Sequence, residues 1–218
     1  MRTIPAAILI CGLAGGLAAQ QGDHLEISAV GGGSLYRDLT ARGADPARTA
    51  KVGFYNGAAA GVVACQRGGE HWDGELHYLF QTNHMRLRAG EGAAGSASFA
   101  ARSHTFHFDG VLYATRRDAR IRPFIAGGPG LKVYQATGQE RAFQPLNNIV
   151  VFSKENQTKF LVSAGGGIKF KIHKSALVRL DFRDYMTGIP KNFTAFPGVK
   201  LSGQFHNLVA TVGVGVVF

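Results

Sequence analysis

The chain has 218 residues, of which 45 % are hydrophobic and 17 % are charged, and its formal net charge at pH 7 is +10. This length is enough for one substantial domain, and the small share of charged residues is unusual for a soluble basic protein. The 30 glycines show no Gly-X-Y period, which excludes a collagen-like chain.

The N-terminus has the form of a secretory signal peptide. Arg2 precedes an apolar run at residues 4–17, and the small residues Ala18 and Ala19 follow that run. The run is too short, and too rich in glycine and alanine, to favour a transmembrane helix. We expect cleavage after Ala19 or, alternatively, after Ala18.

This reading divides the chain into a signal peptide, residues 1–19, and a single mature domain, residues 20–218. Removal of the signal peptide leaves Cys65 as the last cysteine. We therefore expect an exported domain that is stable without an intrachain disulfide.

Apolar and polar side chains alternate through most of the mature domain, which is the period of a β-strand. In the first such segment Leu25 and Ile27 alternate with Glu26 and Ser28. The clear segments are residues 24–36, 72–81, 105–113, 158–172, 176–185 and 207–218. Residues 52–65 and 121–135 are weaker candidates, because glycines blur the alternation and Pro129 indicates a bulge or a local break. The eight segments are close to the length that a tilted strand needs to cross a bilayer.

The last segment shows the alternation most clearly. One face is apolar and the other is smaller and more polar. The apolar face consists of Leu208, Ala210, Val212, Val214, Val216 and Phe218. Such a strict division is typical of a strand that faces lipid on one side.

The connections between the segments alternate in length. The long ones are residues 37–50, 82–98, 136–157 and 187–204, and the short ones are residues 66–71, 115–120 and 173–174. Long connections on the outside and short turns in the periplasm are typical of an outer-membrane barrel. The sequence therefore predicts an all-β fold, a transmembrane up-and-down antiparallel β-barrel of about eight strands in the bacterial outer membrane.

The main alternative is a soluble up-and-down barrel of the lipocalin kind, which would have its apolar face inside. In the membrane barrel the charged face lines the lumen, because a Lys or Arg near the bilayer midplane costs about 2–4 kcal/mol when it faces lipid. The alternation places a mixed-charge network in the lumen. Its members are Glu26, Glu75, His77, His107, Asp109, Lys169, Arg179, Asp181 and Arg183.

Two further lysines, Lys132 and Lys171, share the inward phase, and we expect both to be hydrated near the rims. Asp181 and Arg183 are next-but-one neighbours on one strand, so we expect each to pair mainly across strands. A network of this kind fills a narrow lumen and argues against free passage of solutes.

Four stretches resemble the OmpA-like family of eight-stranded outer-membrane barrels. They are residues 122–128 (RPFIAGG), 163–167 (SAGGG), 179–185 (RLDFRDY) and the valine-rich strand that ends in Phe218. In that family the terminal aromatic residue is part of the signal that the barrel-assembly machinery reads. The resemblance implies the same role for Phe218 and the alternating residues before it.

No cofactor, metal or catalytic motif emerges from the sequence. The glycine runs lack the spacing of a phosphate-binding loop. His77 and His107 could share the lumen, so a weak metal or proton site is an alternative to an ordinary polar interior. Ser103 and His104 are the nearest match to the serine–histidine pair of an outer-membrane lipid hydrolase, but adjacent strand residues point to opposite faces.

The basic charge is scattered over turns and loops without a nucleic-acid reader motif. Attraction to outer-membrane lipid and lipopolysaccharide is a natural use for it, and a merely solvated surface is the alternative. We expect a monomeric, non-enzymatic structural or surface-interaction protein with its binding specificity in the long outer loops. A narrow porin-like pore and a membrane-embedded lipid hydrolase are the alternative functions.

Overall fold

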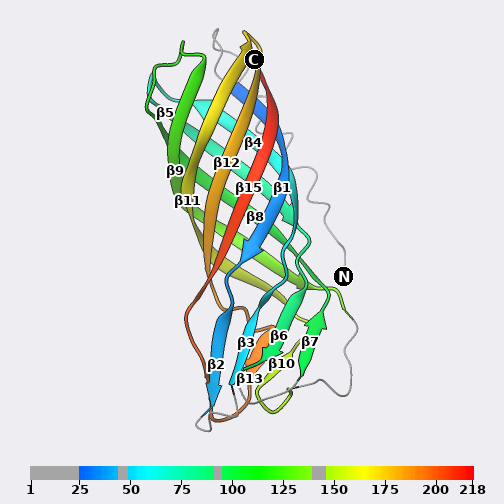
Figure 1. The fold of residues 1–218 in the computed structure, drawn as a ribbon. Coiled ribbons are helices and arrows are strands. Elements are labelled where there is room, and N and C mark those ends of the chain that lie inside the picture. The colour runs from blue at the N-terminus through cyan, green and yellow to red at the C-terminus, as the bar shows by residue number, and fades with distance from the viewer. Residues whose placement is uncertain (1–24, 44–48, 91–94, 139–145) are drawn as a thin grey trace, which may run out of the picture.

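The computed structural model describes residues 25–43, 49–90, 95–138 and 146–218. Eight long strands close into an antiparallel barrel (Figure 1). They are β1 (Leu25–Tyr36), β4 (Gly57–Arg67), β5 (Trp72–Gln81), β8 (Ala101–Tyr113), β9 (Ile121–Ala136), β11 (Asn156–His173), β12 (Ala176–Gly188) and β15 (Gln204–Val217). In the described ranges no helix is long and apolar enough to cross a bilayer.

The ring closes where the first and last barrel strands meet. β1 pairs with β15 from Glu26 opposite Val217 to Tyr36 opposite Asn207, and its other edge pairs with β4. Every barrel strand thus has two neighbours, and no backbone edge is left open to lipid. This confirms the predicted all-β, eight-stranded barrel. The predicted signal peptide and its cleavage site lie outside the described residues.

Pro129 causes no bulge in β9, while the predicted local break is confirmed as a gap in the pairing with β8 between Gly130 and Gly127. β9 is a single strand of 16 residues, and Pro129 lies opposite Val162 of β11. The register with β8 is the same on both sides of the proline, with His107 opposite Gly130 and Gly110 opposite Gly127. Proline removes one N–H donor, and the pairs on either side hold the strand in place.

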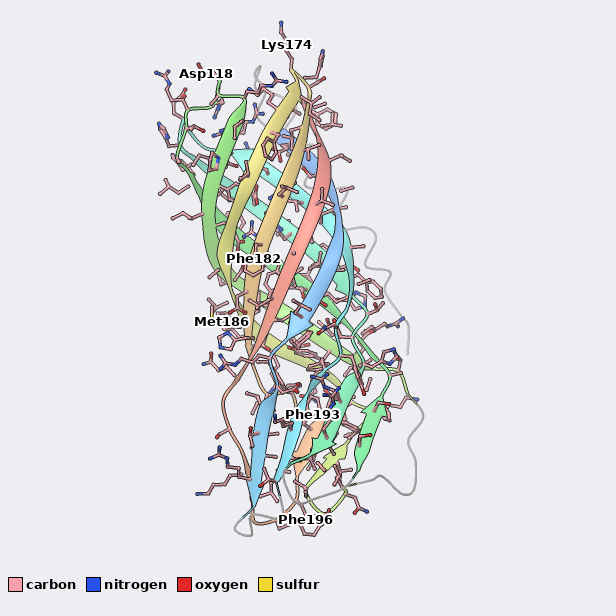
Figure 2. The ribbon with its side chains drawn as sticks, in the orientation of Figure 1. Asp118, Lys174, Phe182, Met186, Phe193 and Phe196 are labelled. Atoms are coloured by element: carbon pink, nitrogen blue, oxygen red, sulfur yellow. The ribbon has the colours of Figure 1, made fainter. Side chains whose placement is uncertain are left out.

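The outside of the barrel is apolar. Phe182 of β12 and Val214 of β15 are 54 % and 64 % exposed, and the residues beside them in the same rows, Leu180 and Val212, are also exposed. Figure 2 shows Phe182 and Met186 on the barrel wall. Exposed apolar rows on a closed barrel with a charged interior are the reverse of a soluble barrel. The outer surface is therefore built to face hydrocarbon.

The remaining seven strands lie beyond one end of the barrel (Figure 1), and we call them the cap. Five form a sheet in the order β14-β2-β3-β6-β7, and two form a separate pair. Their bounds are β2 (Leu39–Gly43), β3 (Thr49–Phe54), β6 (Met85–Ala89), β7 (Ser96–Phe99), β14 (Val199–Leu201), β10 (Val150–Phe152) and β13 (Phe193–Ala195). All four long connections contribute strands to the cap. The predicted segment 52–65 is accordingly two strands, β3 in the cap and β4 in the barrel.

The cap strands pack in a hydrophobic core that continues into the adjoining end of the barrel. Ala41, Val52 and Leu87 of the five-stranded sheet pack in one buried cluster with Val150 and Phe152 of the β10–β13 pair. Among the described residues, the five-stranded sheet is therefore covered on one face only. The long connections, which the sequence indicated as loops, form an ordered two-layer structure because these apolar residues bury one another.

Candidate functional site

All nine residues of the predicted lumen network lie on the inward face of the barrel and are buried. Arg179, Glu75 and Asp109 have no exposed surface, and Asp181, the most exposed of the nine, is 7 % exposed. Inward glycines make room for the large side chains. A Cβ at Gly130 of β9 would overlap the side chain of His107 on β8.

Glu75 of β5 is the centre of the network. Its carboxylate lies 2.9 Å from Nζ of Lys169, 2.9 Å from Arg179 and 3.2 Å from Arg183. His77 adds a fourth contact at 2.9 Å. One acid thus binds three cations that arrive from β11 and β12, and these contacts cross the lumen.

Glu26 and Asp181 are two further acids of the network. Glu26 accepts a hydrogen bond from Lys169 at 2.9 Å. Asp181 accepts from Arg179 at 2.7 Å and from Arg183 at 3.3 Å, both on its own strand. The prediction that Asp181 pairs mainly across strands is therefore wrong, because the long arginine side chains fold back along β12. Arg183 does pair across the lumen, with Asp109 and Glu75.

The two lumen histidines meet as a stacked pair. The ring centroids of His77 and His107 lie 4.4 Å apart. His77 bonds Glu75, while His107 bonds Asp109 at 2.9 Å and the Tyr185 hydroxyl at 3.1 Å. The possible ligand atoms of His77, His107 and Asp109 lie within 4.8 Å of one another, which is close enough to hold a metal ion. The Arg183 guanidinium lies 3.4 Å from Nε2 of His77, however, and a fixed positive charge there opposes metal binding.

Lys132 is completely buried, so the prediction that it lies hydrated at a rim is wrong. Its Nζ donates to Gln81 Oε1 at 2.7 Å and lies 5.0 Å from the ring centre of Tyr36. Gln81 Oε1 also accepts from Asn207 at 2.8 Å. Tyr36 and Tyr134, aromatic residues at the cap end of the barrel, have their ring centres 5.0 and 5.5 Å from the Nζ of Lys132. Lys132 belongs to a polar cluster without an acid among the described residues.

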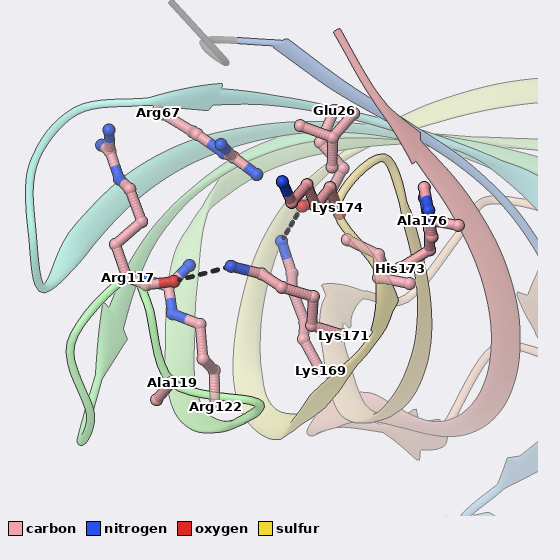
Figure 3. Close-up of a pocket in the computed structure, with 12 residues that line it drawn as sticks. Glu26, Arg67, Arg117, Ala119, Arg122, Lys169, Lys171, His173, Lys174 and Ala176 are labelled. Atoms are coloured by element: carbon pink, nitrogen blue, oxygen red, sulfur yellow. Dashed lines mark hydrogen bonds and ion pairs between the residues drawn. The ribbon is translucent and has the colours of Figure 1, made fainter.

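The other end of the barrel, at the short turns, is basic. Lys171 is half-buried there and donates to the carbonyl of Arg117 at 3.1 Å, as Figure 3 shows. Arg122 packs over the ring of Tyr113 at 3.6 Å and lies 3.8 Å from Asp73. Lys171 therefore occupies the rim position expected from the sequence.

The lumen is filled between these two ends. A cavity of about 10 Å³ lies among Val30, His77, Arg183 and Tyr185, and this is room for about one water molecule. At the cap end, Phe54 contacts the rings of Tyr36, Tyr134 and Phe205 at centroid distances of 4.6, 5.4 and 5.3 Å. These aromatic residues close the lumen where the barrel meets the cap.

Ser103 and His104 do not form a nucleophile–base pair. The Ser103 hydroxyl points inward and donates to Gln81 Oε1 at 3.2 Å. His104 faces outward and bonds the hydroxyl of Tyr78 at 2.9 Å. The two side chains lie on opposite sides of the barrel wall, as the strand period requires.

Phe218 lies at the short-turn end, at the end of the apolar row of β15. Its backbone N–H donates to the carbonyl of Leu25 at 2.8 Å, and its side chain is 64 % exposed. The C-terminal residue is thus tied to the first barrel strand while its ring projects outward.

The cap residues are the ones that the sequence analysis missed. The signal was present: Ala50 and Val52 alternate with Lys51, and Met85 and Leu87 alternate with Arg86. These runs are only five or six residues long. In the sequence analysis the run of β6 falls in a connection, and that of β3 is divided between the connection 37–50 and the segment 52–65. The apolar side chains of these runs can be buried only where the four connections lie together and form a shared core.

Neither a protein-family model nor a curated protein sequence matches the chain. Solved structures do. The outer membrane protein OprG from Pseudomonas aeruginosa has a TM-score of 0.60 at 12 % identity, covering 88 % of this chain and 95 % of that one. Neisserial surface protein A has a TM-score of 0.53 at 10 % identity, covering 89 % and 97 %. Together with the closed ring, the apolar outer wall and the charged lumen, this likeness shows that the chain has the fold of the eight-stranded outer-membrane β-barrels.

Proposed function

We propose that this protein is a structural and surface-interaction protein of the outer membrane, in which the barrel is an anchor and the cap is the binding surface. One observation carries the proposal: the lumen is filled while the long connections are folded into an ordered cap. In outer-membrane barrels the long connections face the outside of the cell, which puts the cap on the extracellular side.

The interior supports an anchor rather than a pore. A porin-like function requires a continuous water-filled path. Here Arg179 and Glu75 bridge the lumen, and Phe54 and Tyr134 stack at its cap end. Opening a path would require the separation of buried ion pairs, which is costly in a low-dielectric interior.

A lipid hydrolase is the less favoured alternative. Such an enzyme needs a nucleophile within hydrogen-bond reach of a base. The inward Ser103 and the outward His104 do not meet this requirement. We therefore propose a protein without catalytic activity, with no cofactor.

The proposed partners follow from the outer surface of the barrel and from its C-terminal residue. Lipid surrounds the apolar wall, and the barrel-assembly machinery reads the exposed aromatic ring of Phe218 during insertion. The barrel has no open strand edge through which a second copy could pair, and we propose a monomer.

Two measurements on the full-length protein test this proposal. In planar bilayers we expect no stepwise conductance from the folded protein, and regular conductance steps would replace the anchor with a narrow pore. In cells that express the protein we expect an unchanged lipid A mass spectrum. Loss of an acyl chain in that spectrum would establish the hydrolase instead. Heat-modifiable migration on gels serves as the control for folding in both cases.

A further inference from the structure

The uncovered face of the five-stranded cap sheet is basic. In β2, β3 and β6 the side chains that alternate with the apolar core point to this face. It carries five cations and several hydroxyl groups. We call the five cations the basic face: Arg42, Lys51, Arg86, Arg88 and Lys200.

Strand pairing puts cations directly opposite one another on the basic face. Lys200 of β14 lies opposite Arg42 of β2. Lys51 of β3 lies opposite Arg88 of β6. Like charges in directly opposite positions destabilise a sheet. Cap folding by itself therefore does not favour this arrangement, and an anionic ligand would relieve the repulsion.

Only one of the five cations has an acidic partner in the described part of the chain. Arg86 binds both carboxylate oxygens of Asp38, at 2.7 and 2.8 Å. The side chains of Arg42, Lys51, Arg88 and Lys200 are exposed, and no ion pair joins them to a described acid. Among the described residues, four exposed cations of this face thus have no acidic partner.

A hollow adjoins the β14 edge of this face. It has a volume of about 600 Å³ and lies over the paired strands β2 and β14 and the residues that flank β14. Arg42 and Lys200 supply positive charge there, and Thr40 and Ser202 supply hydroxyl groups. Gly43 and Gly198 line the rest, so the backbone is open to approach. Charged and hydroxyl donors around an open hollow suit the oxygens of a phosphate group.

The orientation of the sheet indicates which phosphate-bearing molecule lies next to the basic face. The cap strands continue along the long axis of the barrel beyond its end (Figure 1), so the basic face stands upright above the membrane surface instead of lying flat on it. The molecules that surround an outer-membrane barrel on this side are lipopolysaccharides, which carry phosphates on lipid A and the inner core. Confinement to the same membrane gives them a high effective concentration next to this face.

We infer that the basic face binds the phosphate groups of lipopolysaccharide molecules that surround the barrel. This inference rests on the proposed function, because it assigns a ligand to the cap. Binding would depend on salt, since exposed cations are screened by ions. The triplet Arg42, Arg88 and Lys200 should carry much of the affinity.

The test compares two triple variants with matched chemistry. R42Q/R88Q/K200Q removes two arginines and one lysine from the basic face. R116Q/R120Q/K174Q removes the same residue types from exposed short-turn positions at the opposite end of the barrel. Each full-length protein, folded in zwitterionic detergent, is titrated with rough-form lipopolysaccharide, with its dephosphorylated form, and with heparin as a soluble sulfated polysaccharide.

We expect the basic-face variant to bind rough-form lipopolysaccharide at least about tenfold more weakly than the wild type, because each basic residue at an anionic surface contributes several-fold. The short-turn variant should stay within about twofold, and dephosphorylation should weaken binding to the wild type as much as the basic-face variant does. Equal binding by both variants would overturn the inference. Tighter binding of heparin than of lipopolysaccharide would also overturn it, in favour of a soluble acidic polysaccharide. Neither result changes the planar-bilayer test of the anchor function, so the two proposals can fail separately.

Discussion

Arg179 of β12 reaches across the lumen to Glu75 of β5 and places its guanidinium 2.9 Å from the carboxylate. The two strands lie on opposite sides of the eight-stranded ring, four positions apart in its order. A direct ion pair between opposite walls is possible only in a narrow barrel, where side chains fill the interior. This contact therefore joins opposite walls of the barrel and also blocks its lumen.

Replacing Glu75 with Gln should destabilise the barrel strongly. The substitution leaves Lys169, Arg179 and Arg183 without their shared acid, and breaking a buried ion pair from one side costs about 3–5 kcal/mol. Urea unfolding in detergent micelles, followed by tryptophan fluorescence, measures the loss. Asp118→Asn, in an exposed short turn (Figure 2), is the control and should change little. The double variant E75Q/R179M should recover part of the lost free energy of unfolding. A loss in the double variant greater than the sum of the two single losses would contradict the pairing of Glu75 with Arg179.

Substitution by methionine should have opposite effects on stability at the two buried lysines, Lys169 and Lys132. Lys169→Met leaves Glu26 and Glu75 short of a cation and should lower the free energy of unfolding by about 3–5 kcal/mol. Lys132→Met removes a buried charge that has no described acidic partner, and Gln81 keeps its bond from Asn207. Its stability should equal or exceed that of the wild type. Parallel urea titrations of both variants make the comparison, and a large loss for Lys132→Met would indicate an acid that pairs with it.

Phe54→Ala should loosen the cap and leave the barrel folded. Phe54 is 2 % exposed and touches four aromatic rings, and truncating such a residue costs about 3–5 kcal/mol. Limited proteolysis should cut the variant within the cap strands, while its heat-modifiable migration stays that of the wild type. Phe196→Ala, a substitution of a half-exposed ring at the cap tip (Figure 2), is the matched control. Equal resistance of both variants to protease would show that Phe54 does not hold the cap together.

Deleting Phe218 should impair assembly more than stability. Its ring is exposed and the lost packing is small, but the family resemblance gives it a role in recognition by the assembly machinery. We expect less heat-modifiable protein in outer-membrane fractions and more degradation in the periplasm. Phe218→Tyr keeps an aromatic ring and should assemble normally. If the deletion variant assembled with the yield of the wild type, Phe218 would not be part of the assembly signal.

The mature protein should begin at Gln20, or at Ala19 if cleavage follows Ala18. N-terminal sequencing of protein purified from membranes gives the answer directly. Retention of Arg2 would show that the segment is not a cleaved signal peptide.

The barrel could be predicted from the sequence because its main rule is local. Side chains alternate across a strand, so Leu180 and Phe182 must share one side while Arg179 and Arg183 share the other. Lipid on one side and a closed lumen on the other allow only one assignment of these faces. The eight spanning segments and the inward phase of the nine network residues follow from this rule.

The tertiary structure alone decided which charges meet and what the long connections form. Glu75 and Arg179 are 104 residues apart, and they pair because the strand registers around the ring bring them to the same height. Lys132 has the same alternation whether it lies at a rim or in the interior, so its depth also depends on register. The cap exists because four connections lie at one end of the barrel, where short apolar runs such as that of β3 can bury one another. Alternation is set by the backbone of a single strand, whereas height, partners and shared cores are set by how all the strands pair.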